Sequence, residues 1–290
     1  MKPTKEQFLI AIARIETFSA APRILSRALT MLRDPESDLD SIATLVGSDS
    51  ALAADIIRCA NSAFYGAGGV KVQTIGQAVQ KIGFRETIRR LNLTVSRITA
   101  GRNLDCYGIF ADDFWAESLF NGLFLFTLAE QTGAVDPDEA YTVGLLRFIG
   151  RLAINQSIRD LGGGLFWLGE QRLTAWELEN VGFTQANAGA ILLSKWQFPD
   201  EMVQAIAGQD APELLPKTNW LAEALFFSSA LLPRGAGVPF DASLAALVTT
   251  PPLGSDFMQR NGLAPEVVEE LLVKTRQAFE EVRKSFGGRN

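Results

Sequence analysis

The apolar residues of the chain recur at the three- and four-residue spacing of amphipathic helices and almost nowhere alternate as they do in a strand. Phe8, Ile12 and Ile15 predict a first helix, and Pro265 to Phe286 a last one. The stretch from Phe114 to Ala129 is so apolar that its helix must be buried on most of its circumference. The pattern predicts an all-α protein, a multi-helix bundle with two packed helical subdomains.

Polar residues at helix N-termini divide this pattern into elements. Asp136 precedes a proline and then a carboxylate, which together favour the first turn of a helix. Ser37-x-x-Asp40 and Thr174-x-x-Glu177 both have the capping-box spacing. We therefore expect a helix to begin at each of these three places.

Composition excludes several classes of chemistry. The chain has 290 residues and no histidine, so it can hold no Ser-His-Asp triad, no Cys-His pair and no His-ligated metal. Its formal net charge of −6 argues against non-specific nucleic-acid binding, which depends on phosphate neutralisation.

The two cysteines, Cys59 and Cys106, suit a reducing compartment. With no evident signal peptide and no apolar run near the roughly 20 residues of a membrane span, we expect a cytoplasmic protein with no membrane association.

Positive charge is concentrated in one segment. Between Val70 and Arg102 there are seven basic residues and one acid, a net +6 that leaves −12 for the remainder. Such a patch can bind an acidic partner or a phosphorylated ligand, although a solvated face or pairing with the chain's own acids would also explain it. The candidate partner- or anion-binding residues are Arg85, Arg89, Arg90 and Arg97.

Two other clusters have structural explanations. Asp112, Asp113 and Glu117 could form a carboxylate site, but acids at a helix N-terminus that oppose the macrodipole explain them more simply. The end of another predicted helix combines a polar pair with Phe64 and Tyr65. We predict that these two aromatic side chains are largely buried beneath the following loop.

The same helix end carries a resemblance. The stretch from Ile57 to Gly66 resembles the signature of the HDOD family, output domains related to HD-type metal-dependent phosphohydrolases. Residues 140–152 and 182–199 resemble later segments in the same order, and the likeness runs from about Pro22 to about Pro212. The signature residues are Asn61, Ser62, Phe64, Tyr65 and Gly66.

The resemblance implies an HD-like helical module of bacterial signal transduction, a family generally thought not to hydrolyse anything. It divides the chain into an N-terminal helix at 1–20, an N-terminal subdomain at 21–103, a degenerate hydrolase-like subdomain at 104–212 and a C-terminal extension at 213–290. It also locates the positions where an HD hydrolase holds its metal. Here those vestigial positions are Glu117, Arg147, Phe148, Gln185, Gln209 and Asp210.

These departures decide the functional expectation. The dyad that gives HD hydrolases their name falls on Arg147 and Phe148, and an arginine beside a phenylalanine cannot replace a ligating His-Asp pair. We therefore expect no metal, no cofactor and no catalysis, but a regulatory module that binds a protein partner or ligand. A receiver protein or a component of a cyclic-dinucleotide pathway would suit this role.

Two alternatives stay open at this point. One is a phosphohydrolase or cyclic-dinucleotide phosphodiesterase whose metal is held by carboxylates alone, since magnesium accepts such oxygen ligands. Its ligands would be Glu117, Asp112, Asp113 and Asp210. The other is a sensor that keeps a nucleotide in the vestigial cleft without hydrolysing it.

Overall fold

The computed structural model confirms the all-α prediction. It describes residues 2–15, 26–31, 34, 36–48, 50–62, 65, 72–99, 103–231 and 252–285. Over these residues every named element is a helix, and the only extended pairing is an isolated bridge between Leu104 and Ile109. No helix in these ranges is both long enough and apolar enough to cross a membrane.

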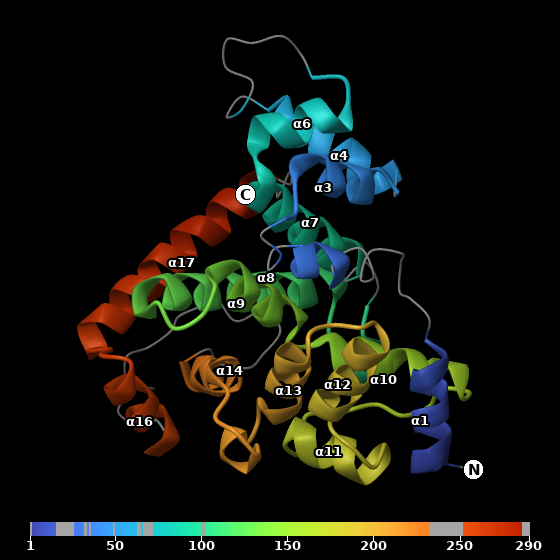
Figure 1. The fold of residues 1–290 in the computed structure, drawn as a ribbon. Helices are drawn as coiled ribbons and strands as arrows, with labels where there is room; N and C mark the ends of the chain where they lie inside the picture. Colours follow the sequence, from blue (N-terminus) through green and yellow to red (C-terminus); the bar gives the residue numbers. More distant parts are fainter. Residues whose placement is uncertain are drawn as a thin grey trace. The chain divides into compact units, whose positions relative to one another are not determined.

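The chain forms two compact units (Figure 1). One comprises Glu16–Thr99, and the other comprises Met1–Ile15 together with Ala100–Asn290. The division lies near the expected boundary at residue 103, while residues 1–15 and the expected extension after 212 group with the hydrolase-like part.

The described part of the smaller unit includes α3 (Leu39–Gly47), α4 (Ser50–Ala60), α6 (Ile75–Ile82) and α7 (Phe84–Thr99). Helix α6 packs against α3 and α4, and α4 also contacts α7. Helix α6 begins with a capping box between Thr74 and Gln77. Helix α3 corrects a prediction, because its N-cap is Asp38, which accepts from the Ser41 backbone N–H, and not Ser37.

The larger unit contains the remaining elements. They are α1 (Lys5–Arg14), η1 (Asp105–Tyr107), α8 (Ala111–Thr132), α9 (Pro137–Leu146), α10 (Ile149–Asp160), α11 (Leu173–Asn180), α12 (Gln185–Lys195), α13 (Asp200–Gly208), η2 (Pro212–Leu214), α14 (Trp220–Leu231), α16 (Pro252–Arg260) and α17 (Pro265–Ser285). As predicted, α8 is buried around most of its circumference. Helices α9 and α17 both pack on it (Figure 1).

Two close helix crossings fix the frame of this unit. At Gly144 a Cβ atom would lie 2.6 Å from the carbonyl oxygen of Asn121, so α9 can approach α8 only because position 144 has no side chain. At Gly150 a Cβ atom would overlap the Gln185 carbonyl oxygen and lie 2.7 Å from Gly189 N. Helices α10 and α12 therefore touch through their backbones.

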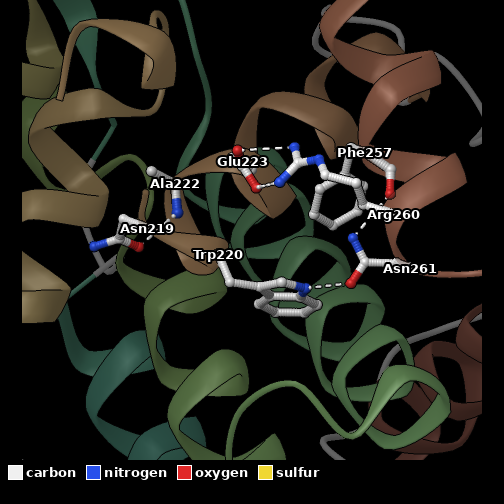
Figure 2. A network of polar contacts seen from close by, with 7 residues as sticks. All are labelled: Asn219, Trp220, Ala222, Glu223, Phe257, Arg260 and Asn261. Atoms are coloured by element: carbon white, nitrogen blue, oxygen red, sulfur yellow. Dashed lines mark hydrogen bonds and ion pairs between the residues drawn. The ribbon is translucent and has the colours of Figure 1, made fainter. Parts of the chain in front are cut away.

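A polar network joins α14 to α16 (Figure 2). The Trp220 indole N–H donates to Asn261 Oδ1 at 2.8 Å, and Arg260 binds Glu223 at 2.9 Å. Asn219 accepts from the Ala222 backbone N–H and so caps the start of α14. These contacts join α14 to α16, and the segment after residue 212 is held to the preceding helices by the packing of α14 on α8 and α13 and of α17 on α8.

Candidate functional site

The residues that we expect at the vestigial HD positions lie in and around a group of buried and half-buried polar side chains, which we call the buried polar cluster. It draws on α8, the turn between α9 and α10, α11, the start of α12 and the end of α13. Its members are Glu117, Arg147, Arg151, Glu177, Gln185 and Gln209.

Arg147, which we expect at the first dyad position, serves as a structural cross-link. The residue is 2% exposed. Its Nη1 donates to Asn121 Oδ1 at 2.7 Å and to Ser228 Oγ at 2.6 Å, which ties the end of α9 to α8 and α14. The Gln209 carboxamide donates to the Arg147 backbone carbonyl at 3.2 Å. Two vestigial positions therefore bond to each other.

Phe148, which we expect at the second dyad position, has two guanidinium groups over its ring. The Arg151 Cζ atom lies 3.9 Å from the centre of the Phe148 ring, and the Arg147 Cζ atom lies 5.0 Å from it. Arg151 also forms an ion pair with Glu117 at 3.1 Å, and its side chain is 6% exposed. A cation held by a carboxylate and an aromatic face is a stable arrangement within a protein.

Glu177 is the member that sequence reasoning missed. Its carboxylate is fully buried, accepting from the Tyr107 hydroxyl at 3.0 Å and from the Gln185 backbone N–H at 2.8 Å. Burial raises its pKa to about 7, and the Asp210 carboxylate adds to this rise. The two hydrogen bonds and the Arg151 guanidinium oppose it.

The capping-box prediction at Thr174 is wrong, and its failure explains the miss. Helix α11 begins at Leu173 after Arg172, so Glu177 lies in its middle and faces inward. In the sequence, a glutamate three residues after a threonine is indistinguishable from a capping acid. Its burial follows from the position of η1, about 70 residues earlier in the chain.

The residues present do not fit a catalytic metal. The described part of the chain contains no group of three or more Cys, Asp or Glu side chains placed to share an ion. Glu117 is bound by Arg151, and two guanidinium groups lie against Phe148. The carboxamide oxygens of Gln185 and Gln209 are buried without a protein hydrogen-bond partner, and Oδ2 of Asp210 is buried as well. One carboxylate and two neutral oxygens are still too few for a hard divalent cation, which takes six or more oxygen ligands.

Among the family-signature residues, Asn61 joins two separate parts of the chain. The Asn61 carboxamide donates to the Val72 carbonyl and accepts from the Val72 backbone N–H, both at 2.8 Å. Ser62 is exposed, and Tyr65 is half-buried, less than we predicted. Phe64 and Gly66 lie outside the described residues. Asn61 therefore joins the end of α4 to the chain just before α6.

The basic residues of α7 are distributed around its one acid. Arg90 binds Glu86 at 3.0 Å, and Arg89 lies 3.8 Å from the same carboxylate. Arg85 is exposed, and the Arg89 side chain is 39% exposed. The Arg97 side chain lies outside the described residues. At least two of the four arginines thus reach solvent.

Comparison with solved structures places this fold among similar helical proteins. An HDOD domain protein of unknown function from Geobacter sulfurreducens matches with a TM-score of 0.67 and 21% identity, over 95% of this chain and 98% of that one. A candidate signal transduction protein from Marinobacter aquaeolei VT8 has a TM-score of 0.68 and 22% identity, over 98% and 65%. A candidate phosphohydrolase from Shewanella amazonensis SB2B has a TM-score of 0.59 and 21% identity, over 91% and 98%.

Sequence comparison agrees with the fold. An uncharacterized protein from Treponema pallidum (strain Nichols) is 25% identical over 198 residues, which cover 67% of this chain and 37% of that protein. The match therefore spans little more than a third of that relative. The model of the HDOD domain matches residues 19–212, about two thirds of the chain. This chain therefore belongs to the HDOD domain family.

Proposed function

We propose that the protein is a non-catalytic module of signal transduction that works by binding a protein partner. The observation that carries this proposal is the set of contacts made by the two residues expected at the dyad position. Arg147 is committed to Asn121 and Ser228, and Phe148 supports a second guanidinium group. Positive charge and an aromatic ring thus fill the place where a hydrolase of the HD type holds a cation.

The same geometry makes a protein a better ligand than a nucleotide. Four of the six vestigial positions, Arg147, Phe148, Gln185 and Gln209, are between 1% and 5% exposed. A nucleotide would have to displace these side chains from their bonds to the surrounding helices. A protein partner can bind to exposed side chains without displacing buried ones. We therefore infer that binding takes place outside the buried polar cluster.

The absence of catalysis is tested by metal titration and turnover on the intact protein. We expect calorimetry with Mg²⁺ and Mn²⁺ to show no stoichiometric binding, and bis-p-nitrophenyl phosphate and cyclic di-GMP to remain uncleaved with either ion. Glu117→Gln is the matched control, because it neutralises the best-placed carboxylate of the carboxylate-only alternative. Metal-dependent turnover that is lost in Glu117→Gln would overturn the proposal and establish that alternative.

The surface best suited to a partner is the solvent-facing side of α7. Arg85 and Arg89 are four residues apart, so they lie on one helical face, and Glu86 is the only acid between Val70 and Arg102. Exposed ion pairs contribute only about 0–1 kcal/mol each, so folding gives little reason to concentrate charge there. Binding to an acidic partner explains the concentrated charge better, because complementary charges speed the encounter of two proteins and exclude wrong partners.

Charge reversal at Arg89 tests this surface. A protein captured from the source bacterium on the immobilised chain should associate about 3–10-fold more slowly with Arg89→Glu at low salt, and the difference should shrink as salt screens the charges. Arg172→Glu is the control, because Arg172 is also exposed but lies outside the basic segment. Equal association rates for wild type and Arg89→Glu at low salt would exclude α7 as the binding face.

A further inference from the structure

Helix α11 is held to its unit by few interactions other than those of Glu177. It is eight residues long, and only Trp176 and Glu177 are buried on it. The chain before it includes Gly162, Gly163 and Gly164, and the chain after it includes Gly182, all with positive φ. A short helix between glycine-containing turns is the kind of element that opens locally without unfolding the rest of a protein.

Glu177 links this helix to two distant parts of the chain. One carboxylate oxygen accepts from Tyr107 on η1, and the other accepts from the backbone N–H of Gln185 at the start of α12. Tyr107 in turn packs edge-on against Trp176, with ring centres 5.7 Å apart. The only two buried side chains of α11 therefore contact the same tyrosine.

We propose that Glu177 is a proton-operated latch that holds α11 closed most firmly when its carboxyl group is neutral. A neutral carboxyl still offers an acceptor to the Gln185 N–H, and the Tyr107 hydroxyl can accept as well as donate. Protonation therefore removes a buried charge without breaking either link. Loss of the proton leaves a charged carboxylate buried away from water. This cost favours the open state of the helix, in which water solvates the carboxylate.

The groups around Glu177 define the electrostatic balance of the latch. The Arg151 guanidinium on α10 and the Tyr107 hydroxyl on η1 stabilise the charged form, and the Asp210 carboxylate after α13 opposes it. The neighbouring Cys106 thiol stays neutral, because burial raises its pKa far above the physiological range. The effect of burial on the pKa is larger than that of the groups that stabilise the charged form. The closed state therefore binds the Glu177 proton more tightly than the open state does.

The direction and size of the pH effect follow from linkage. The pKa of Glu177 is about 7 when the helix is closed, against 4.5 for the ordinary side chain in water. The closed state therefore holds more proton between these two values, and opening becomes easier as pH rises through this range, levelling off above pH 7. Between pH 6 and pH 8 the equilibrium constant for opening should increase about 10-fold.

Hydrogen exchange on the full chain measures this opening. After correction for the intrinsic pH dependence of exchange, α11 amides should lose about 10-fold in protection between pH 6 and pH 8. Glu177→Gln should abolish this change, because its neutral amide neither titrates nor charges the site. Glu170→Gln, an exposed acid in the preceding loop, is the control and should keep the wild-type response.

A second variant keeps the proposal testable if Glu177→Gln folds poorly. Tyr107→Phe removes one donor to the charged form and should shift the opening profile to higher pH. Corrected exchange of α11 that is equal at pH 6 and pH 8 in the wild type would overturn the latch. Protection of the α11 amides as strong as that of the α8 amides would also overturn it, because α11 would then exchange only by global unfolding and not by local opening.

Discussion

Replacing Gly150 by alanine is expected to destabilise the larger unit by about 3 kcal/mol or more, and thus to lower the yield of folded protein sharply. The added Cβ atom would overlap the Gln185 carbonyl oxygen and approach Gly189 N. Both neighbours are backbone atoms, so neither can rotate away as a side chain would. Helices α10 and α12 would have to separate, and the buried polar cluster, to which both contribute residues, would lose its geometry.

Gly76→Ala provides the matched control for this prediction. Gly76 is also within a helix, α6, but nothing lies within 4 Å of its would-be Cβ atom. Alanine there should be neutral or stabilise by up to about 1 kcal/mol, because it restricts the unfolded chain and favours helix. Thermal and urea unfolding of both variants measure the change in stability. A loss seen in Gly150→Ala but not in Gly76→Ala is caused by the close helix contact at Gly150 and not by alanine in general. A Gly150→Ala protein as stable as wild type would contradict the α10–α12 packing.

Removing the Arg147 side chain is expected to have the second large effect. Arg147→Ala should cost about 3–5 kcal/mol, because it leaves a buried cavity and deprives Asn121 and Ser228 of their shared donor. Urea unfolding followed by circular dichroism measures the loss.

Two further variants at or near this site show what Arg147 contributes. Arg147→Met keeps much of the volume and removes the buried charge, and the Ser228 hydroxyl can still donate to Asn121, so it should lose less than half as much as Arg147→Ala. Arg172→Ala, at an exposed arginine, should stay within about 0.5 kcal/mol of wild type. If Arg147→Ala were as mild as Arg172→Ala, Arg147 would not be the cross-link that the structure indicates.

The cross-link through Arg147 bears on our proposal that the protein binds no metal. Its guanidinium group joins the end of α9 to α8 and α14, so a metal at this position would have to break those bonds. The buried polar cluster is therefore part of the folded framework of the larger unit. We therefore propose partner binding on α7 and regulation at Glu177, and no substrate within the buried polar cluster.

The sequence alone predicted the helices because helix formation depends on neighbours within one turn. The spacing of Phe8 and Ile12 and the signal at Asp136 each involve residues no more than four positions apart. The same locality explains two errors. Ser37 and Asp38 are both competent caps, and the Thr174 pattern satisfies the capping rule whether or not the helix begins there.

Residue types alone also show that Arg147 and Phe148 supply no metal ligands, whatever their arrangement. What those residues do instead was decided by tertiary structure. Arg147 meets Ser228, 81 positions later, and Glu177 meets Tyr107, 70 positions earlier. The burial of Glu177, and with it the raised pKa, depends on helices that pack around it from separate parts of the chain. No local pattern records such contacts, because desolvation is a property of the folded surroundings and not of the residue that is desolvated.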